Sequence, residues 1–167
     1  MSAERRILES SFPDDDGSAD PAVAAALAAY ARGGAYVDAL MALRSSRLLV
    51  PVVALLGEVE YDEQGLAHDK TSDMAAVLLQ GADGRLALLA FTSTDALAAW
   101  NPEARPVAVP ARVAAQSAIQ DDAAALVIDV AGPATFVVEG DDLTGLAAGW
   151  QLARAGERSA WIRVSGE

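Results

Sequence analysis

The chain has 167 residues, no cysteine, and 24 acidic against 12 basic residues, which give a formal charge of −12. The absence of cysteine excludes disulfides, thiolate nucleophiles and cysteine-ligated metal sites. The strong negative charge disfavours binding to nucleic acid or to an anionic membrane surface. No strand is followed by a glycine-rich phosphate loop, so we expect no cofactor.

The length suits a single domain, and an apolar fraction of 53% is sufficient for a core. The longest strongly apolar run, residues 48–56, is about half the length of a membrane-spanning helix. The N-terminus lacks the apolar stretch of a secretory signal, so we expect a cytoplasmic protein.

The first ordered element is expected at residue 20. Residues 1–19 mix charges, Ser, Pro and Gly without a period, which predicts a flexible N-terminal tail followed by a folded domain over 20–167. Asp20-Pro21 is typical of a helix start, and Gly33-Gly34 ends that helix. A second helix is predicted over about 35–44.

The next segments predict strands. The run 48–56 is apolar on both faces, and Pro51 predicts that this strand lies at an edge or carries a bulge, because proline has no N–H to donate. Residues 57–69 form a polar, acidic loop. Residues 74–80 and 85–91 form a hairpin around the turn 81–84, which contains Asp-Gly.

Helices and strands alternate over the rest of the chain. Residues 92–95 cap a short helix that ends before Pro102, a strand covers 107–109, and Pro110 opens a further helix. That helix is predicted to bury a stripe at helical spacing: Ala111, Ala114, Ala115, Ala118 and Ile119.

The C-terminal third continues with a strand over 124–130, a turn at Gly132-Pro133 and a partner strand over 135–138. Asp141-Asp142 is predicted to cap a last helix, and residues 159–164 add an edge strand. The elements predict one α+β (mixed α/β) domain, with a mixed, mainly antiparallel sheet and helices packed on it.

Several segments together resemble a known family. They are 48–54, 69–111 and 125–143, with the pattern Gly-x-Asp-Gly, then Phe-Thr-Ser, Trp-Asn-Pro and Ile-Asp-x-Ala-Gly-Pro. The chain resembles the SseB N-terminal-domain family, named for enhanced serine sensitivity. The resemblance implies a soluble bacterial protein and a shared fold, and no particular activity.

His68 is the single histidine. With Asp69, Asp73 and Glu63 it suggests a metal site, but such sites usually have more than one nitrogen or sulfur ligand. A solvated loop histidine is favoured, and we expect no metal. A single histidine also leaves little basis for a Ser-His-Asp triad.

Two groups of polar residues are candidates for ligand binding at helix or strand ends. Thr92, Ser93 and Asp95 lie at a helix start, where they either hold an anion or cap the helix; Asp95 opposes an anion, so capping is favoured. Asp129 follows a buried strand and is either partly buried and functional or bonded to the turn amides at 131–132. The turn interpretation is favoured.

Lys70 is the single lysine. A desolvated lysine acts as a base or a nucleophile, whereas an exposed one pairs with Asp69 or Asp73, which is the favoured interpretation. Among the tryptophans, Trp100 and Trp150 lie on apolar helical stripes and are expected in the core. Trp161 is expected to be exposed and to join an interface.

Three functional hypotheses remain open. The leading one is a non-enzymatic interaction module with a protein partner or a second copy, associating through edge strands near Pro51 and at 159–164. The alternative is a small-ligand receptor or enzyme with a cleft built from the loops 57–73, 92–95 and 129–133. In the third, the acidic segment 58–69 binds a basic protein.

Overall fold

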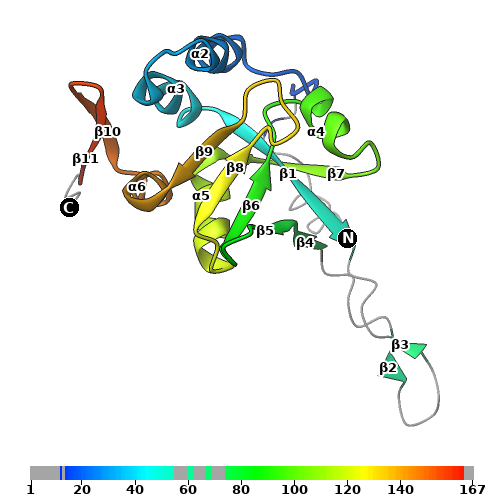
Figure 1. The fold of residues 1–167 in the computed structure, drawn as a ribbon. Helices are drawn as coiled ribbons and strands as arrows, with labels where there is room; N and C mark the ends of the chain where they lie inside the picture. The colour runs from blue at the N-terminus through cyan, green and yellow to red at the C-terminus, as the bar shows by residue number, and fades with distance from the viewer. Residues whose placement is uncertain (1–11, 13, 55–59, 62–66, 69–73, 164–167) are drawn as a thin grey trace.

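The computed structural model describes residues 12, 14–54, 60–61, 67–68 and 74–163, and it confirms a mixed α+β fold (Figure 1). The helices are α2 (Pro21–Ala31), α3 (Tyr36–Leu43), α4 (Thr94–Trp100), α5 (Ala111–Gln120) and α6 (Gly140–Ala148). The first six strands are β1 (Arg47–Ala54), β2 (Glu60–Tyr61), β3 (Ala67–His68), β4 (Met74–Ala76), β5 (Leu78–Gln80) and β6 (Leu86–Ala90). The other five are β7 (Arg105–Pro110), β8 (Ala125–Ile128), β9 (Phe136–Glu139), β10 (Gln151–Ala155) and β11 (Arg158–Ile162).

The main sheet has two parts that meet at one bridge. Strands β5, β6, β8 and β9 form a four-stranded part, and β4, β1 and β7 form a three-stranded part. The amide of Leu49 donates to the carbonyl of Phe91 at 2.7 Å, and the amide of Phe91 donates back at 2.8 Å. Among these strand pairs only β6–β8 is parallel, which confirms the mixed, mainly antiparallel sheet.

The prediction that Pro51 marks an edge or a bulge is wrong. Strand β1 lies between β4 and β7, and it pairs with β7 one residue to one along 47–52. The backbone N–H and C=O of Leu49 both point toward β6. Because backbone groups of alternate strand residues point to the same side, those of Pro51 point there too, and the Pro51 carbonyl accepts from the Val77 amide at 3.3 Å. The missing N–H therefore falls where the neighbour of β1 changes from β6 to β4, so no ladder bond is lost.

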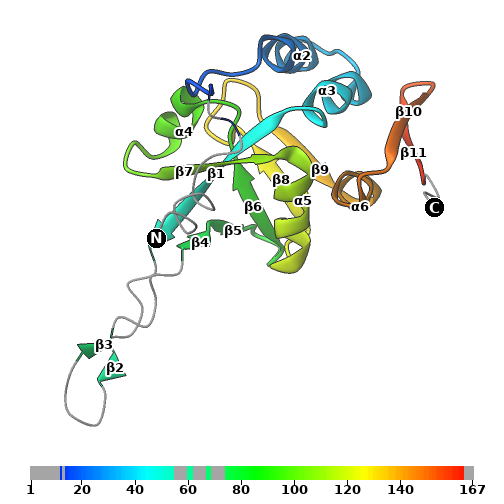
Figure 2. The ribbon, with the colours of Figure 1, turned by 180° about the vertical axis from the view of Figure 1, so that it is seen from behind.

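Alternate residues of the strands pack against different helices. One face packs under α2, α3, α5 and α6; its strand residues are Leu48, Val50, Leu88, Ala90, Leu126, Ile128, Phe136 and Val138. Figure 2 shows α5 in front of β6 and β8. On the other face, Leu49, Leu89 and Phe91 pack against Ala96 and Leu97 of α4.

Helix α5 buries four of the five residues predicted for it. Ile119 is the exception, with 43% of its surface exposed. The helix ends at Gln120, and the Ala123 amide folds back to the carbonyl of Ala118 at 2.8 Å as the chain turns toward β8. Ile119 therefore lies on the last turn and faces away from the core.

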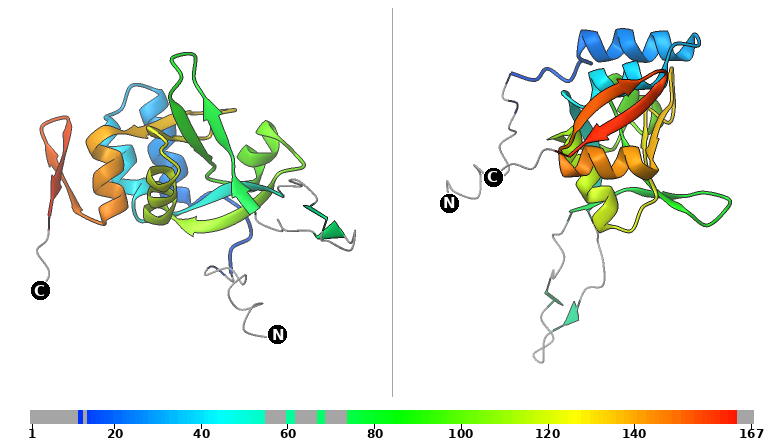
Figure 3. Two further views of the ribbon diagram at one scale, coloured as in Figure 1. Left: turned by 90° about the horizontal axis from the view of Figure 1, so that it is seen from below. Right: turned by 90° about the vertical axis from the view of Figure 1, so that its left-hand side faces the viewer.

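The C-terminal region differs from the prediction in two ways. Helix α6 begins after Glu139 without a side-chain cap, and Asp141 and Asp142 lie inside its first turn. Strand β11 pairs with β10, which the sequence did not predict, as a separate two-stranded hairpin instead of an edge of the main sheet. Figure 3 shows this hairpin beside α6.

Candidate functional site

A groove of about 720 Å³ lies over the ends of β6 and β8, between α2 and α4. In Figure 1 the turn that follows β8 lies between these two helices. The lining residues are Ala19, Ala24, Leu27, Ala28, Ala31, Arg32, Thr92, Ser93, Asp95, Ala96, Ala99, Asp129, Ala131, Gly132, Pro133 and Ala134. The groove therefore brings together two of the three predicted loops, 92–95 and 129–133.

Thr92 and Asp129 form the polar base of this groove. Thr92 is 6% exposed and Asp129 is 3% exposed. The Thr92 amide donates to Oδ1 of Asp129 at 2.9 Å, and the Thr92 hydroxyl donates to Oδ2 at 2.7 Å. Both carboxylate oxygens of this buried group are thus hydrogen-bonded to a single residue.

The parallel pairing of β6 and β8 explains this contact. Thr92 comes two residues after β6 and Asp129 comes directly after β8, and neighbouring parallel strands end at the same edge of a sheet. Asp129 has φ of 56°, a left-handed conformation that aspartate tolerates better than most residues. This conformation starts the turn that leads into β9.

The favoured prediction, that the Asp129 carboxylate bonds to the turn amides at 131–132, is wrong. The turn is closed by the backbone: the carbonyl of Asp129 accepts from the Gly132 amide at 2.9 Å and from the Thr135 hydroxyl at 3.0 Å. The carboxylate bonds to Thr92 instead of to the turn amides. Burial raises the pKa of Asp129, and the two hydrogen bonds from Thr92 oppose that shift.

Ser93 caps α4, as the sequence predicted. Its hydroxyl oxygen accepts from the Ala96 amide at 3.0 Å. Asp95, in the first turn of α4, is exposed at the rim of the groove. Binding of a ligand by Thr92, Ser93, Asp95 or Asp129 stays a prediction.

Lys70 lies outside the described residues, as do Asp69, Asp73 and Glu63, so the predicted convergence of Lys70 with the groove stays a prediction. His68 lies in β3 and pairs with Glu60 of β2. Among the described residues, no group of three or more His, Cys, Asp or Glu side chains is placed to hold a metal ion. No helix in the described ranges has the length and apolarity needed to span a membrane.

The tryptophans are all partly buried. Trp100 packs on Phe91 with ring centroids 5.6 Å apart, and so joins the core as predicted. The prediction that Trp161 is exposed is wrong, because its indole lies against Gly145 of α6 and donates to Asp142 at 2.9 Å. A role for Trp161 in an interface stays a prediction.

Sequence reasoning missed the contribution of α2 to the groove. Ala24, Ala28 and Ala31 recur at helical spacing and face the groove, while Leu27 points to both groove and core. The signal was present as a small-residue stripe beside the apolar stripe, but such a stripe indicates a groove only when the neighbouring element is known.

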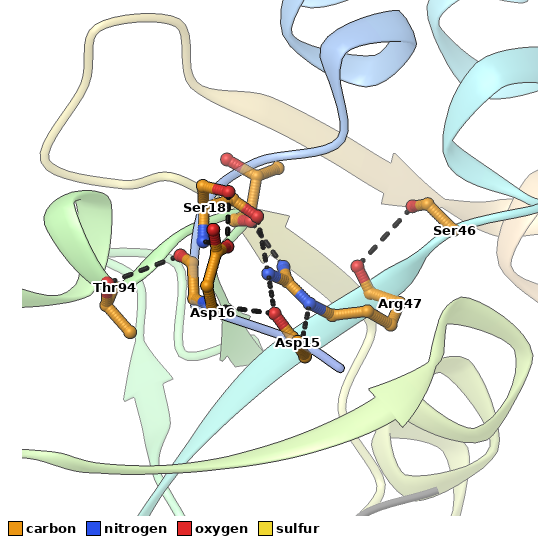
Figure 4. Close-up of polar contacts among 8 residues, drawn as sticks. Asp15, Asp16, Ser18, Ser46, Arg47 and Thr94 are labelled. Atoms are coloured by element: carbon orange, nitrogen blue, oxygen red, sulfur yellow. Dashed lines mark hydrogen bonds and ion pairs between the residues drawn. The ribbon is translucent and has the colours of Figure 1, made fainter. Parts of the chain in front are cut away.

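Sequence reasoning also missed contacts made by the segment that precedes α2 (Figure 4). Arg47 of β1 donates to Asp15 through Nε at 2.6 Å and through Nη2 at 2.9 Å, and its Nη1 donates to the carbonyl of Thr92. The Thr94 amide donates to the Gly17 carbonyl at 2.8 Å. The hydrogen bonds from Arg47 lower the pKa of Asp15. Part of the predicted tail, residues 15–18, therefore packs against the domain; residues 1–11 and 13 lie outside the described residues.

Comparisons with known proteins place this fold in a family. The family model for the SseB protein N-terminal domain matches residues 23–144, which include most of α2, the whole main sheet and the base of the groove. A search of curated proteins and a search of solved structures each gave no significant match. On the extent of the family match, the chain belongs to the SseB protein N-terminal domain family.

Proposed function

We propose that the protein is a non-enzymatic binding module, and that the groove between α2, α4 and the 129–134 turn holds an apolar segment of a protein partner. The observation that carries this proposal is the difference between the polar base of the groove and its apolar walls. The polar groups at its base, Thr92, Ser93 and Asp129, are already hydrogen-bonded within the protein, while its apolar walls remain exposed.

The base of the groove is hydrogen-bonded from within. Thr92 uses its amide and its hydroxyl on Asp129, and Ser93 accepts from the first turn of α4. A polar metabolite is usually recognised by a few convergent polar groups that it can pair with. Here such pairing requires breaking a bond that already satisfies a buried group, which is costly. We therefore expect the groove to recognise a partner by the shape of its apolar surface and not through hydrogen bonds to the base.

The walls offer exposed apolar surface. Ala24, Ala28 and Ala31 of α2 are exposed on one side, and Ala99 of α4 is exposed on the other. Pro133 is exposed on the turn between them. Alanine walls leave room for larger side chains from outside, and burying apolar surface contributes roughly 25 cal/mol per Å². An apolar segment of a partner fits this surface.

The charges around the groove favour a partner with basic residues beside the apolar ones. Asp95 lies on the rim of the groove. Two more exposed carboxylates, Asp16 and Asp20, line an adjoining hollow at the N-terminal end of α2, and Ala19 lines both the hollow and the groove. Arg32 is the basic lining residue. Opposite charges at a rim steer association and select partners more than they add affinity.

The test uses synthetic amphipathic peptides with matched variants of α2. A leucine–lysine peptide is expected to shift the amide NMR signals of residues 24–32, 95–99, 131, 132 and 134, whereas a leucine–glutamate peptide of equal length is not. Ala28→Arg fills the groove with a cation and should abolish the shifts. Ala25→Arg is the control, because Ala25 is also exposed on α2 but does not line the groove.

Three results would contradict the proposal: shifts spread evenly over the acidic surface, equal binding by both peptides, or equal loss in the Ala25→Arg and Ala28→Arg proteins. Circular dichroism of both variants verifies that the fold is retained.

A second candidate, a small-ligand receptor, is favoured by one observation. Asp129 is a buried carboxyl with a raised pKa at the base of the groove that contains two of the predicted loops, 92–95 and 129–133, and perturbed groups often mark ligand sites. A metabolite bound there should raise the melting temperature of the protein, and Asp129→Asn should remove the effect.

A further inference from the structure

We infer that the outer edge of β5 is a self-association surface, where β5 of a second copy of this chain pairs antiparallel with it. The inference is independent of the groove, which lies over the ends of β6 and β8. It rests on the direction of backbone groups, on the exposure of β5 and on the distribution of charge.

The outer edge of β5 carries unpaired backbone groups. The carbonyl of Val77 accepts from Leu89, and the Gly81 amide donates to Arg85, so odd-numbered residues of this strand face β6. By alternation the amides and carbonyls of Leu78 and Gln80 face away from β6. Within the described part of the chain, no residue pairs with them.

The other long edges of the main sheet are protected. Leu49 faces β6, so its cross-strand partner Ala108 turns its backbone groups away from β1, and Pro106 and Pro110 do the same. Both prolines lack an N–H, which blocks strand addition at the edge of β7. At the edge of β9, the Tyr36 hydroxyl donates to the outward carbonyl of Val137 at 2.6 Å.

Among the residues that the structure describes, none protects the outer edge of β5 in this way, and the strand is uncharged. Leu78 and Leu79 are 37% and 45% exposed, and successive strand residues point to opposite faces, so β5 is open on both faces as well as at its edge. Neither proline nor a charged residue occurs between Met74 and Ala82. Exposed, uncharged edge strands are the ones that pair with another chain.

The charge distribution favours a second copy over a basic partner. Copies with a formal charge of −12 repel each other over most of their surface, and the stretch 74–82, which has no charged residue, adds nothing to that repulsion. The stretch 74–82 itself has no carboxylate for a basic partner to pair with. An identical antiparallel strand is self-complementary: Leu78 pairs with Gln80 of the second copy, Gln80 with Leu78, and the two Leu79 side chains meet on the two-fold axis.

The size of this contact sets its strength. Two short strands bury less than the about 1,200 Å² that is typical of a stable dimer, so association should be weak and visible only in concentrated protein. Because salt screens the repulsion between the acidic surfaces, the dimer should strengthen as salt rises, whereas binding of a basic partner would weaken.

The experiment is sedimentation velocity of the full chain over a wide concentration range, at low and at high salt. The expected result is a monomer–dimer equilibrium that salt shifts toward dimer. Leu79→Lys places two like charges opposite each other and should weaken association by roughly tenfold or more. Val107→Lys is the control, since Val107 is 42% exposed but lies on the proline-protected β7.

A second variant and a second readout keep the test sharp. Gln80→Pro removes one outward N–H, as Pro106 does on β7, and should also weaken the dimer without adding charge. Hydrogen exchange of the Leu78 and Gln80 amides should slow with concentration, while the Leu79 amide, which faces β6, should not change. A monomer at every concentration, unchanged association in Leu79→Lys, or equal loss in Val107→Lys would overturn the inference.

Discussion

At the scale of single residues, the contact between Thr92 and Asp129 fixes the base of the groove. It joins two positions 37 residues apart, and both are buried. A buried carboxylate is costly unless it is hydrogen-bonded, and Thr92 supplies an amide and a hydroxyl to it. The pair therefore holds the turn after β8 against the start of α4, at the base of the groove between α2 and α4.

The raised pKa of Asp129 predicts a pH-dependent stability. The folded protein keeps the Asp129 proton to a higher pH than the unfolded chain, in which aspartate has a pKa of about 3.9. Between these two pKa values the folded state binds more protons, so this group lowers the free energy of unfolding as pH rises through the window. Asp129→Asn has no proton to lose, so its free energy of unfolding relative to the natural protein should increase across the window and then level off.

Urea denaturation from below pH 4 to neutral pH checks this prediction. Asp15, whose pKa is lowered by Arg47, contributes the opposite slope: its stabilisation is present above the pKa of the unfolded chain and is lost as the pH falls. That contribution is the same in both proteins and cancels in the difference. A difference that stays constant with pH would show that Asp129 has an ordinary pKa.

At the scale of elements, the C-terminal hairpin depends on one glycine of α6. A Cβ on Gly145 would lie 2.2 Å from Cδ2 of Trp161, which is closer than any real contact. The indole also donates to Asp142 at 2.9 Å, and the Ser159 hydroxyl donates to the same oxygen at 2.5 Å. The hairpin is therefore attached to α6 by a flat ring on a helix surface that has no side chain at that point.

This close packing predicts a substitution whose effect changes sign. Alanine in a helix interior is normally more stable than glycine by roughly 0.5–1 kcal/mol. In the natural protein Gly145→Ala should instead lower the free energy of unfolding, because the ring of Trp161 must move away. In a Trp161→Ala background the same substitution should raise it by roughly 0.5–1 kcal/mol. Chemical denaturation of the four proteins checks this, and the same sign in both backgrounds would contradict the packing.

At the scale of the whole molecule, short sequence patterns predicted where helices and strands occur but not which strands pair with one another. Asp20 and Pro21 start α2 as predicted, and the Asp-Gly turn joins β5 to β6, with Gly84 at φ of 84°. These features depend on a few adjacent residues. The position of β1 inside the sheet depends on β7, whose paired residues lie 53 (Val52 to Arg105) to 63 (Arg47 to Pro110) positions further along the chain, and no local pattern contains that information.

The same distinction holds for the candidate site. The sequence identified Thr92, Ser93, Asp95 and Asp129 as polar residues at element ends, and the parallel pairing of β6 and β8 brought them together. The Asp129 carboxylate was predicted to bond to the amides of its own turn, because a sequence shows only the partners that are near along the chain. The exposed alanines of α2 were not predicted to line a groove, because the sequence does not show that α4 lies opposite them.

The central claim is that the apolar walls of the groove recognise a partner while its polar base holds the shape. The most direct test compares the affinity of the leucine–lysine peptide for the Ala28→Arg and Asp129→Asn proteins, by calorimetric titration against the natural chain. The account predicts that Ala28→Arg abolishes binding and that Asp129→Asn changes the affinity by less than about threefold, under 1 kcal/mol. Full binding by Ala28→Arg together with loss of binding in Asp129→Asn would contradict it.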